Sequence, residues 1–273
     1  MKFNKIIMNP PYLGSLHLEI LSAAVSLLLK DENSMCVNLS PSRWLQDSLA
    51  KYKAGSDLSK FEGPICSHLV DFENIPAEEA QKHFFADIWT DLGIYSLKKK
   101  GTFDYRNIYR STDSDFLDRV VIPVITGQTE SIDKYLTPMG VCNFDTPFVR
   151  VSNLHGHQGK RDFYEFMTPQ ESIAFSKEAS SCSRTFNVET EEEAKNFFKI
   201  IHNDFMRYLC KLTKGDMNVP WRYAPYLGRY TNPRTGLKGY LSEWTTEDLC
   251  EFYGLSDTAV KRINEVVSKE KQK

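Results

Sequence analysis

The sequence predicts an α/β fold, because strand-like apolar segments alternate with helical segments over residues 1–105. In the first unit, the apolar segment Lys5 to Met8 precedes apolar side chains at helical spacing: Leu18, Leu21, Val25 and Leu28. The second unit begins with the apolar segment 35–39, which ends at a proline and a polar loop, Ser40 to Trp44. This alternation predicts a mainly parallel sheet with crossover helices and covered faces, in which ligands bind beyond the carboxyl ends of the strands.

Further elements of the α/β region follow the same alternation. Residues 45–60 are typical of a helix, and segments 65–72 and 91–97 are typical of strands. A run of lysines, Lys98 to Lys100, follows the last of these strands. We therefore expect a first domain over residues 1–105.

The rest of the chain predicts an α+β domain over residues 106–240 and a C-terminal helical element over residues 241–273. The apolar segment 115–126 contains Pro123, which keeps part of it off a central strand, and Phe148 to Leu154 alternates as a strand. Thr190 to Glu193 is a capping box that predicts a helix extending to Gly215. Its apolar stripe is Ala194, Phe197, Phe198, Ile201, Phe205, Leu209 and Leu212.

Composition favours a folded, cytoplasmic protein. The chain has 273 residues, with 41% hydrophobic and 26% charged side chains. Its longest strongly apolar stretch, residues 20–29, is too short to span a membrane, and the N-terminus lacks the pattern of a signal peptide. The six scattered cysteines are expected to be reduced thiols. A net charge of -2 means that any nucleic-acid binding depends on local basic patches.

The motif Asn9-Pro10-Pro11-Tyr12 stands at the end of the first predicted strand. The amide oxygen of Asn9 and the carbonyl of Pro10 both accept hydrogen bonds, so they would bind the hydrogens of an amino group on a flat base. Pro10 and Pro11 fix φ and hold these acceptors in place. Tyr12 offers a ring on which a flipped base stacks. The alternative is an ordinary turn stiffened by proline.

Several segments resemble the DNA adenine-N6 methyltransferases. Ile6 to Tyr12 resembles their catalytic motif, and Asn38 to Leu45 resembles their later strand-end motif, especially in the Eco57I-like restriction-modification group. His83 to Tyr95 resembles the last motif of the catalytic domain, which places an aromatic ring on the other face of the flipped base. Phe84 or Phe85 matches that ring, with core packing as the alternative.

This resemblance implies a partial Rossmann-like methyltransferase sheet, followed by a target-recognition domain, with S-adenosylmethionine as the cofactor. The family binds this cofactor with a glycine-rich turn after a strand and an acidic residue at the end of the next strand, and we identify neither. The glycine-rich stretch His155 to Gly159 follows no clear strand and opens no clear helix. We therefore expect the later part of such an enzyme, truncated or split, with a second protein chain supplying the cofactor-binding half.

Two segments are candidates for DNA contact. The first is the polar loop 154–164, with His155, Lys160 and Arg161. For this loop a metal site with His157, or plain solvation, is the alternative. The second is segment 207–240, which carries seven cations, one acid and interleaved aromatic rings. Its candidate DNA-binding residues are Lys214, Arg222, Arg229, Arg234 and Lys238, with solvated loop charges as the alternative.

The C-terminal segment Trp244 to Ser256 resembles the C-terminal signature of the same enzymes. It predicts a capped short helix, a glycine turn and a second helix with Val260, Ile263 and Val267 inward. The pair is either a DNA-reading helix-turn-helix or a packing element that closes the recognition domain.

Two hypotheses follow from these patterns. The first is a site-specific DNA adenine-N6 methyltransferase subunit or fragment. The second is a catalytically inactive DNA-binding or decoy remnant of a modification enzyme. Action of the motif on RNA or protein remains a third possibility, which the resemblance of the C-terminal half disfavours.

Overall fold

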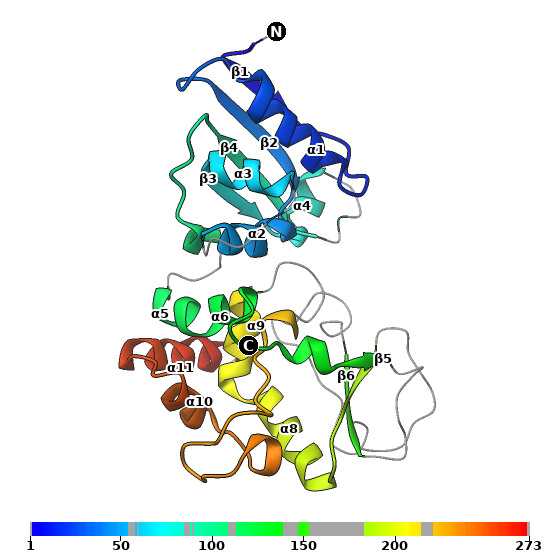
Figure 1. Cartoon of the computed structure of the whole chain (residues 1–273), viewed down its shortest axis with the longest axis vertical. Helices are drawn as coiled ribbons and strands as arrows, with labels where there is room; N and C mark the ends of the chain where they lie inside the picture. The colour runs from blue at the N-terminus through cyan, green and yellow to red at the C-terminus, as the bar shows by residue number, and fades with distance from the viewer. Residues whose placement is uncertain are drawn as a thin grey trace. The chain divides into compact units, whose positions relative to one another are not determined.

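The chain divides into two units, Met1–Thr112 and Asp113–Lys273, each with its own packing (Figure 1). The computed structural model describes residues 2–53, 58, 60–84, 88, 90–108, 113–138, 147–152, 183–213 and 221–271. Both units mix helices with strands, which confirms the predicted α/β class in its broad sense. No helix among these residues is long and apolar enough to cross a membrane.

A four-stranded sheet forms the centre of the N-terminal unit. Its strands are β1 (Lys5–Met8), β2 (Met35–Pro41), β3 (Leu69–Ile75) and β4 (Leu92–Leu97), in the spatial order β1-β2-β4-β3. The strands predicted at residues 5–8, 35–39 and 91–97 are therefore confirmed. β1 and β2 are parallel, with Met8 beside Asn38.

The prediction of a mainly parallel sheet is wrong, because β4 runs antiparallel to both β2 and β3. The reason lies in the connection from β3 to β4. Asp91, just before β4, accepts hydrogen bonds from the Asn74 side chain at 3.0 Å and from the Ala77 backbone N–H at 3.0 Å. The connection therefore leaves and returns at the same end of the sheet, so β4 runs back alongside β3.

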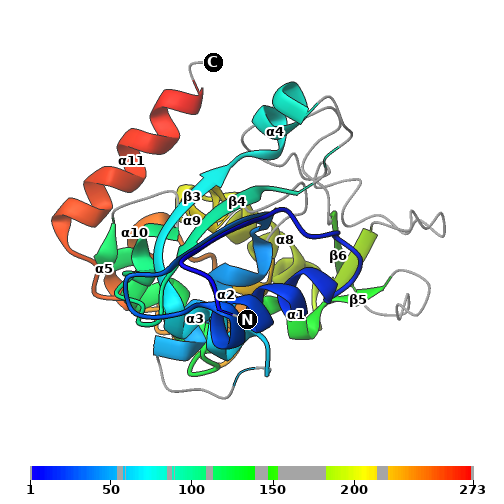
Figure 2. The same cartoon turned by 90° about the horizontal axis from the view of Figure 1, so that it is seen from above.

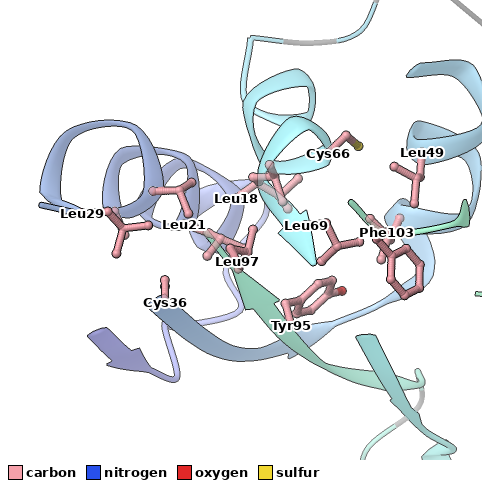
Figure 3. Close-up of a cluster of buried hydrophobic side chains, with 14 of the residues drawn as sticks. Leu18, Leu21, Leu29, Cys36, Leu49, Cys66, Leu69, Tyr95, Leu97 and Phe103 are labelled. Carbon is pink, nitrogen blue, oxygen red and sulfur yellow. The ribbon is translucent and has the colours of Figure 1, made fainter. Parts of the chain in front are cut away.

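Three helices cover one face of this sheet: α1 (Leu16–Ala23), α2 (Arg43–Lys53) and α3 (Glu62–His68) (Figure 2). A π-helical turn, η1 (Ala24–Leu28), extends α1 and confirms the helix predicted there. The buried core between helices and sheet includes Leu21, Leu29, Leu49, Cys66, Leu69, Tyr95 and Leu97 (Figure 3). Helix α4 (Ala77–Phe84) and the 3₁₀ turn η2 (Tyr105–Ile108) complete the unit.

Two predicted boundaries in this unit need correction. The described helix α2 ends at Lys53, short of the predicted residue 60. The strand predicted from residue 65 begins at Leu69, and Ile65 to His68 belong to α3. A short apolar run is compatible with a buried helix as well as with a strand, and here Ile65 and Cys66 face the core from the helix.

The C-terminal unit begins with continuous helical turns, α5 (Ser114–Phe116), η3 (Leu117–Val121) and α6 (Ile122–Ile125), so the segment around Pro123 is helical. After η4 (Ile132–Tyr135), a small antiparallel sheet has the order β5 (Thr137–Pro138), β7 (Ser183–Asn187) and β6 (Phe148–Ser152). The strand predicted at Phe148 is thereby confirmed. Phe186 of β7 stacks on Phe197 with ring centroids 4.0 Å apart.

The long helix predicted from Thr190 to Gly215 is wrong in one respect, because it is broken into α8 (Glu191–His202) and α9 (Asp204–Thr213). The predicted capping box is confirmed: the Thr190 side chain accepts from the Glu193 backbone and the Glu193 side chain accepts from the Thr190 backbone. At the break, Asn203 is extended and its amide oxygen accepts from the Met206 N–H at 2.9 Å. Asn203 thus caps a new helix.

The C-terminal helices α10 (Thr246–Phe252) and α11 (Asp257–Lys271) follow two short 3₁₀ turns, η6 (Trp221–Tyr223) and η7 (Gly239–Leu241). Gly254, with φ of 58°, forms the predicted turn between α10 and α11. In α11, Ala259, Ile263 and Val267 are buried, whereas Val260 is only half-buried. Tyr253 stacks on Phe205 of α9, so this helix pair is packed into the unit.

Candidate functional site at the end of strand β1

The parallel pairing of β1 and β2 brings two predicted motifs to the same end of the sheet. Asn9 to Tyr12 follows β1, and Ser40 to Trp44 spans the end of β2. A contact joins the two strand ends, since the Tyr12 hydroxyl lies 3.2 Å from the Leu39 carbonyl and donates to it. The predicted juxtaposition of these motifs at the carboxyl edge is therefore confirmed.

Asn9 presents its amide at this edge in a defined setting. The Asn9 side chain is exposed, Pro10 is buried, and Pro11 is exposed. The Tyr12 hydroxyl donates a hydrogen bond to Oδ1 of Asn9 at 2.5 Å. Because burial raises the pKa of Tyr12, the phenol remains a neutral donor at neutral pH.

The Tyr12 ring is 44% exposed and packs edge-on against His17 of α1, with centroids 6.4 Å apart. Burial lowers the pKa of His17, and a hydrogen bond to the Gly14 backbone opposes this shift. A largely neutral imidazole therefore supports one edge of the ring, while much of the ring surface stays open to solvent.

The Tyr12 hydroxyl uses one of the two lone pairs of Oδ1 of Asn9, the oxygen that an incoming amino group would also need. If the chain takes part in methyl transfer, as its resemblance to the adenine-N6 methyltransferases implies, Tyr12→Phe, which keeps the ring and releases Oδ1 of Asn9, should retain activity within a few-fold of the unsubstituted chain in complex with its partner. Tyr12→Ala also removes the ring, so kcat/KM should fall by about 10- to 100-fold, the usual cost of losing one base-stacking side chain. Both values come from methyl-transfer kinetics. Equal losses in the two variants would show that the hydroxyl, and not the ring, is what matters.

A buried polar network holds the end of β2. Ser42 donates through its backbone N–H to the Asp91 carbonyl at 3.0 Å and through its hydroxyl to Oδ1 of Asn74 at 3.1 Å. The Asp91 carboxylate, itself buried, accepts from Asn74 and from the start of α4. This network links the ends of β2, β3 and β4, and so positions the loop that faces Asn9.

Sequence reasoning did not single out the residues that support this loop. Tyr95 of β4 donates to the Pro41 carbonyl at 2.8 Å and stacks on Trp44 with centroids 5.9 Å apart. Asn38, fully buried beside Met8, donates to the Ser40 hydroxyl at 2.8 Å. Each is a polar side chain inside an apolar run, and each lies within one of the motifs that resemble the family, but the resemblance gave no role to either residue.

Phe84, one of the two candidates for the second stacking ring, is the last residue of α4 and is 44% exposed. Phe85, the other candidate, lies outside the described residues. An exposed ring is available for contact with a ligand, and the stacking role of Phe84 or Phe85 stays a prediction.

The candidate DNA-binding residues fall into three groups. His155, Lys160, Arg161 and Lys214 lie outside the described residues. Arg229 pairs with Glu130 at 3.1 Å, and Arg234 pairs with Asp248 at 2.9 Å. Arg222 lies over the Tyr223 ring, whereas Lys238 is exposed in the turn before η7.

The Arg234 pair is a structural feature that the sequence did not predict. The Asp248 side chain is only 3% exposed and also accepts from the Asn232 amide and the Thr245 backbone. Burial raises the pKa of Asp248, but Arg234 and the other donors outweigh it, and the pKa lies below its usual value. Arg234 therefore neutralises a buried carboxylate and anchors the turn that carries Lys238.

Strands β1, β2 and β3 do not open into the glycine-rich turn that S-adenosylmethionine enzymes of this family use. β1 is followed by Pro10-Pro11, β2 by Ser42-Arg43, and β3 by Pro76, so none of these strands opens into a glycine-rich turn. Among the described residues, no group of three or more His, Cys, Asp or Glu side chains is placed to hold a metal ion. His155 and His157 fall outside that part of the chain.

Comparison with family models, with curated proteins and with solved structures finds no match to this chain.

Proposed function

We propose that this chain is the later half of a site-specific DNA adenine-N6 methyltransferase, with a Rossmann-like half sheet joined to a target-recognition region. A second protein chain supplies the S-adenosylmethionine-binding half. The observation that carries the proposal is the exposed Asn9 amide beside the Tyr12 ring, at the carboxyl end of a parallel strand pair.

The chemistry of the proposal rests on the two acceptors at this strand end. The amino nitrogen of adenine is a poor nucleophile because its lone pair is delocalised into the ring. Hydrogen bonds from its two hydrogens to the Asn9 amide oxygen and the Pro10 carbonyl favour a tetrahedral nitrogen, whose lone pair is then free to react. The exposed Tyr12 ring supports the base once it has left the duplex.

Binding of DNA is the second part of the proposal and rests on the C-terminal unit. Lys238 is exposed in the turn that Arg234 anchors, so its ammonium group presents positive charge to solvent. Phosphates are the natural ligands of such a surface.

We predict that Lys238→Ala weakens DNA binding and lowers the salt-dependence slope, d log K/d log[salt], by about one. The midpoint temperature of unfolding should stay unchanged, because the lysine is exposed. Arg234→Ala is the matched comparison: it should lower both DNA affinity and thermal stability, since it leaves the buried Asp248 carboxylate without its cation. Titration of labelled duplex at several salt concentrations measures the slope. An unchanged slope for Lys238→Ala would remove Lys238 from the interface.

The test of the whole proposal is methyl transfer to DNA from labelled S-adenosylmethionine. The chain is assayed alone and with candidate partner chains encoded nearby, with Asn9→Ala as the inactive control. We expect activity only in the presence of a partner, and calorimetric titration of the isolated chain should detect no S-adenosylmethionine binding. Robust methylation by the isolated chain would contradict the split arrangement.

One observation favours the second candidate, a DNA-binding or decoy remnant without catalysis. The Tyr12 hydroxyl donates to Oδ1 of Asn9 within the chain itself, a contact that a motif without a substrate would also keep. Such a protein would bind DNA with salt-dependent affinity and would be indifferent to Asn9→Ala. The same assay therefore separates the two candidates.

A further inference from the structure

Exposed apolar side chains are concentrated in the sequence within strand β1 and on either side of it. Among the described residues, six of the ten large apolar side chains that are exposed lie between residues 3 and 27: Phe3, Ile7, Tyr12, Leu13, Leu16 and Leu27. Ile7, in the middle of β1, is the most exposed of them at 86%. Such a concentration marks a surface that another protein covers.

β1 is also an edge strand with unpaired backbone groups. In the order β1-β2-β4-β3, β2 lies on one side of β1 only, while just before β1 the Phe3 backbone is already hydrogen-bonded to Leu28 and Lys30. The Asn4 carbonyl accepts from the Met35 N–H, so by alternation the backbone groups of Lys5 and Ile7 point toward the opposite, open edge. This edge is a template for one more strand.

The sheet face beyond α1, α2 and α3 carries a second apolar row. Ile7 lies beside Val37 in the sheet register, and Leu39 lies beside Ile94. These side chains alternate with Ile6, Met8 and Asn38, which face the helices. Val37, Leu39 and Ile94 are half-buried and Ile7 is exposed, so the apolar row continues to the open edge.

The position of Asn9 determines which way an added strand runs. Ligands of open α/β sheets bind between the carboxyl ends of neighbouring strands, where the connections diverge to opposite sides. The connection after β1 runs through α1 to β2. A connection that leaves in the opposite direction must therefore follow a strand on the open side of β1. A parallel strand there would bring its own carboxyl end next to Asn9 and complete the wall of the site.

A second copy of this chain does not meet that requirement. Two β1 edges related by a two-fold axis pair in antiparallel fashion, because the interface is isologous. Each Asn9 would then face the amino-terminal end of the other β1, and no strand end would be added beside it. The geometry favours a different chain.

We infer that the open edge of β1, with the exposed Ile7 side chain on it, binds a separate α/β protein chain, which adds a parallel strand to β1. The inference rests on the proposed function in one respect: this chain is the one that holds S-adenosylmethionine. The edge that binds the partner and the parallel direction of the added strand are both derived from the strand order and from the position of Asn9.

The test places a photoreactive p-benzoylphenylalanine at position 7 of the full chain in its native host, with the same residue at position 241 as control. Leu241 is an exposed leucine of the C-terminal unit. We expect position 7, but not 241, to crosslink to a different chain, and calorimetry to show that this purified chain binds S-adenosylmethionine. No crosslink at position 7, or crosslinking to a second copy alone, would overturn the inference.

Affinity measurements on the recovered chain then test the surface directly. Ile7→Lys should raise the Kd of the complex about 10- to 100-fold, the effect of losing one buried isoleucine, whereas Leu241→Lys should leave it unchanged. The midpoint of thermal unfolding of the free chain should not move, because the Ile7 side chain is exposed. An unaltered Kd for Ile7→Lys would contradict the inference.

The outcomes separate this inference from the proposed function. Suppose that a chain crosslinks at position 7 and binds S-adenosylmethionine, but the complex does not methylate DNA. That result supports the docking surface and contradicts the proposed function. If the complex methylates DNA but assembles equally well when it carries Ile7→Lys, the result supports the proposed function and contradicts the docking surface.

Discussion

Asn9→Ala should lower kcat for DNA methylation by the reconstituted complex about 100- to 1,000-fold, the typical loss when one preorganised hydrogen-bonding group is removed from a reacting centre. The Asn9 amide oxygen is one of only two acceptors proposed for the amino hydrogens, and alanine offers none. Folding should be unaffected, because the Asn9 side chain is exposed and the Tyr12 hydroxyl retains the Leu39 carbonyl as an acceptor. Single-turnover methyl transfer measures the chemical step.

Two further variants make this result specific. Asn33→Ala removes another exposed asparagine of the same unit, away from the strand end, and should leave kcat unchanged. Asn9→Asp keeps an acceptor oxygen at position 9 and should retain more activity than Asn9→Ala. DNA affinity should be equal in all three, because the lost interaction acts on the reacting nitrogen. Activity of Asn9→Ala within about threefold of the unsubstituted complex, less than 1 kcal/mol in barrier height, would exclude the proposed role.

The local elements of this fold were predictable because their determinants are close in sequence. The capping box at Thr190 and Glu193 spans one helical turn, and the strand Lys5–Met8 is marked by its apolar run and the prolines behind it. The motif at Asn9 could be assigned to a strand end for the same reason. Its nearness to the end of β2 followed from the parallel pairing of two strands joined by a helix.

The predictions that were wrong concern features whose determinants lie far apart in the sequence. The direction of β4 depends on Asp91 binding back to Asn74 and Ala77, and no periodicity records that contact. The break at Asn203 lies within an apolar stripe that continues through it, and it is stabilised by the Asn203 amide donating to the Trp244 carbonyl at 3.1 Å.

The candidate site shows the same division between local and distant determinants. Residue types and spacing predicted the acceptors at Asn9 and Pro10, but not that the Tyr12 hydroxyl binds Asn9. Likewise, the count of cations in segment 207–240 predicted a basic surface without showing that Arg229 and Arg234 each have an acidic partner, Glu130 and Asp248. Charge counts along a chain therefore overestimate the charge that is available to a ligand.

Trp244→Ala should destabilise the C-terminal unit by about 3–5 kcal/mol, the usual cost of truncating a fully buried aromatic side chain. Trp244 is completely buried, and its ring packs edge-on against Phe252 with centroids 5.4 Å apart. Its Nε1–H donates to the Gly239 carbonyl at 2.8 Å. The variant therefore loses packing and also leaves a carbonyl without its donor.

The loss should extend to the turn that carries Lys238. Gly239 has a φ of 60°, and a Cβ on it would lie 2.9 Å from the Gly228 carbonyl oxygen, so the turn tolerates little rearrangement. With the Nε1 contact gone, DNA affinity should fall together with stability. Urea unfolding followed by circular dichroism measures the stability, and titration with DNA duplex measures the affinity.

Matched variants separate the two contributions of Trp244. Trp244→Phe keeps most of the apolar volume but lacks the Nε1–H, so it should cost about 1–3 kcal/mol, the penalty for an unsatisfied buried acceptor. Leu241→Ala truncates a neighbouring side chain that is 54% exposed, and should change stability by no more than about 0.5 kcal/mol. If Trp244→Ala unfolded at the same urea concentration as Leu241→Ala, Trp244 would not be the residue that joins the Lys238 turn to the core of the C-terminal unit.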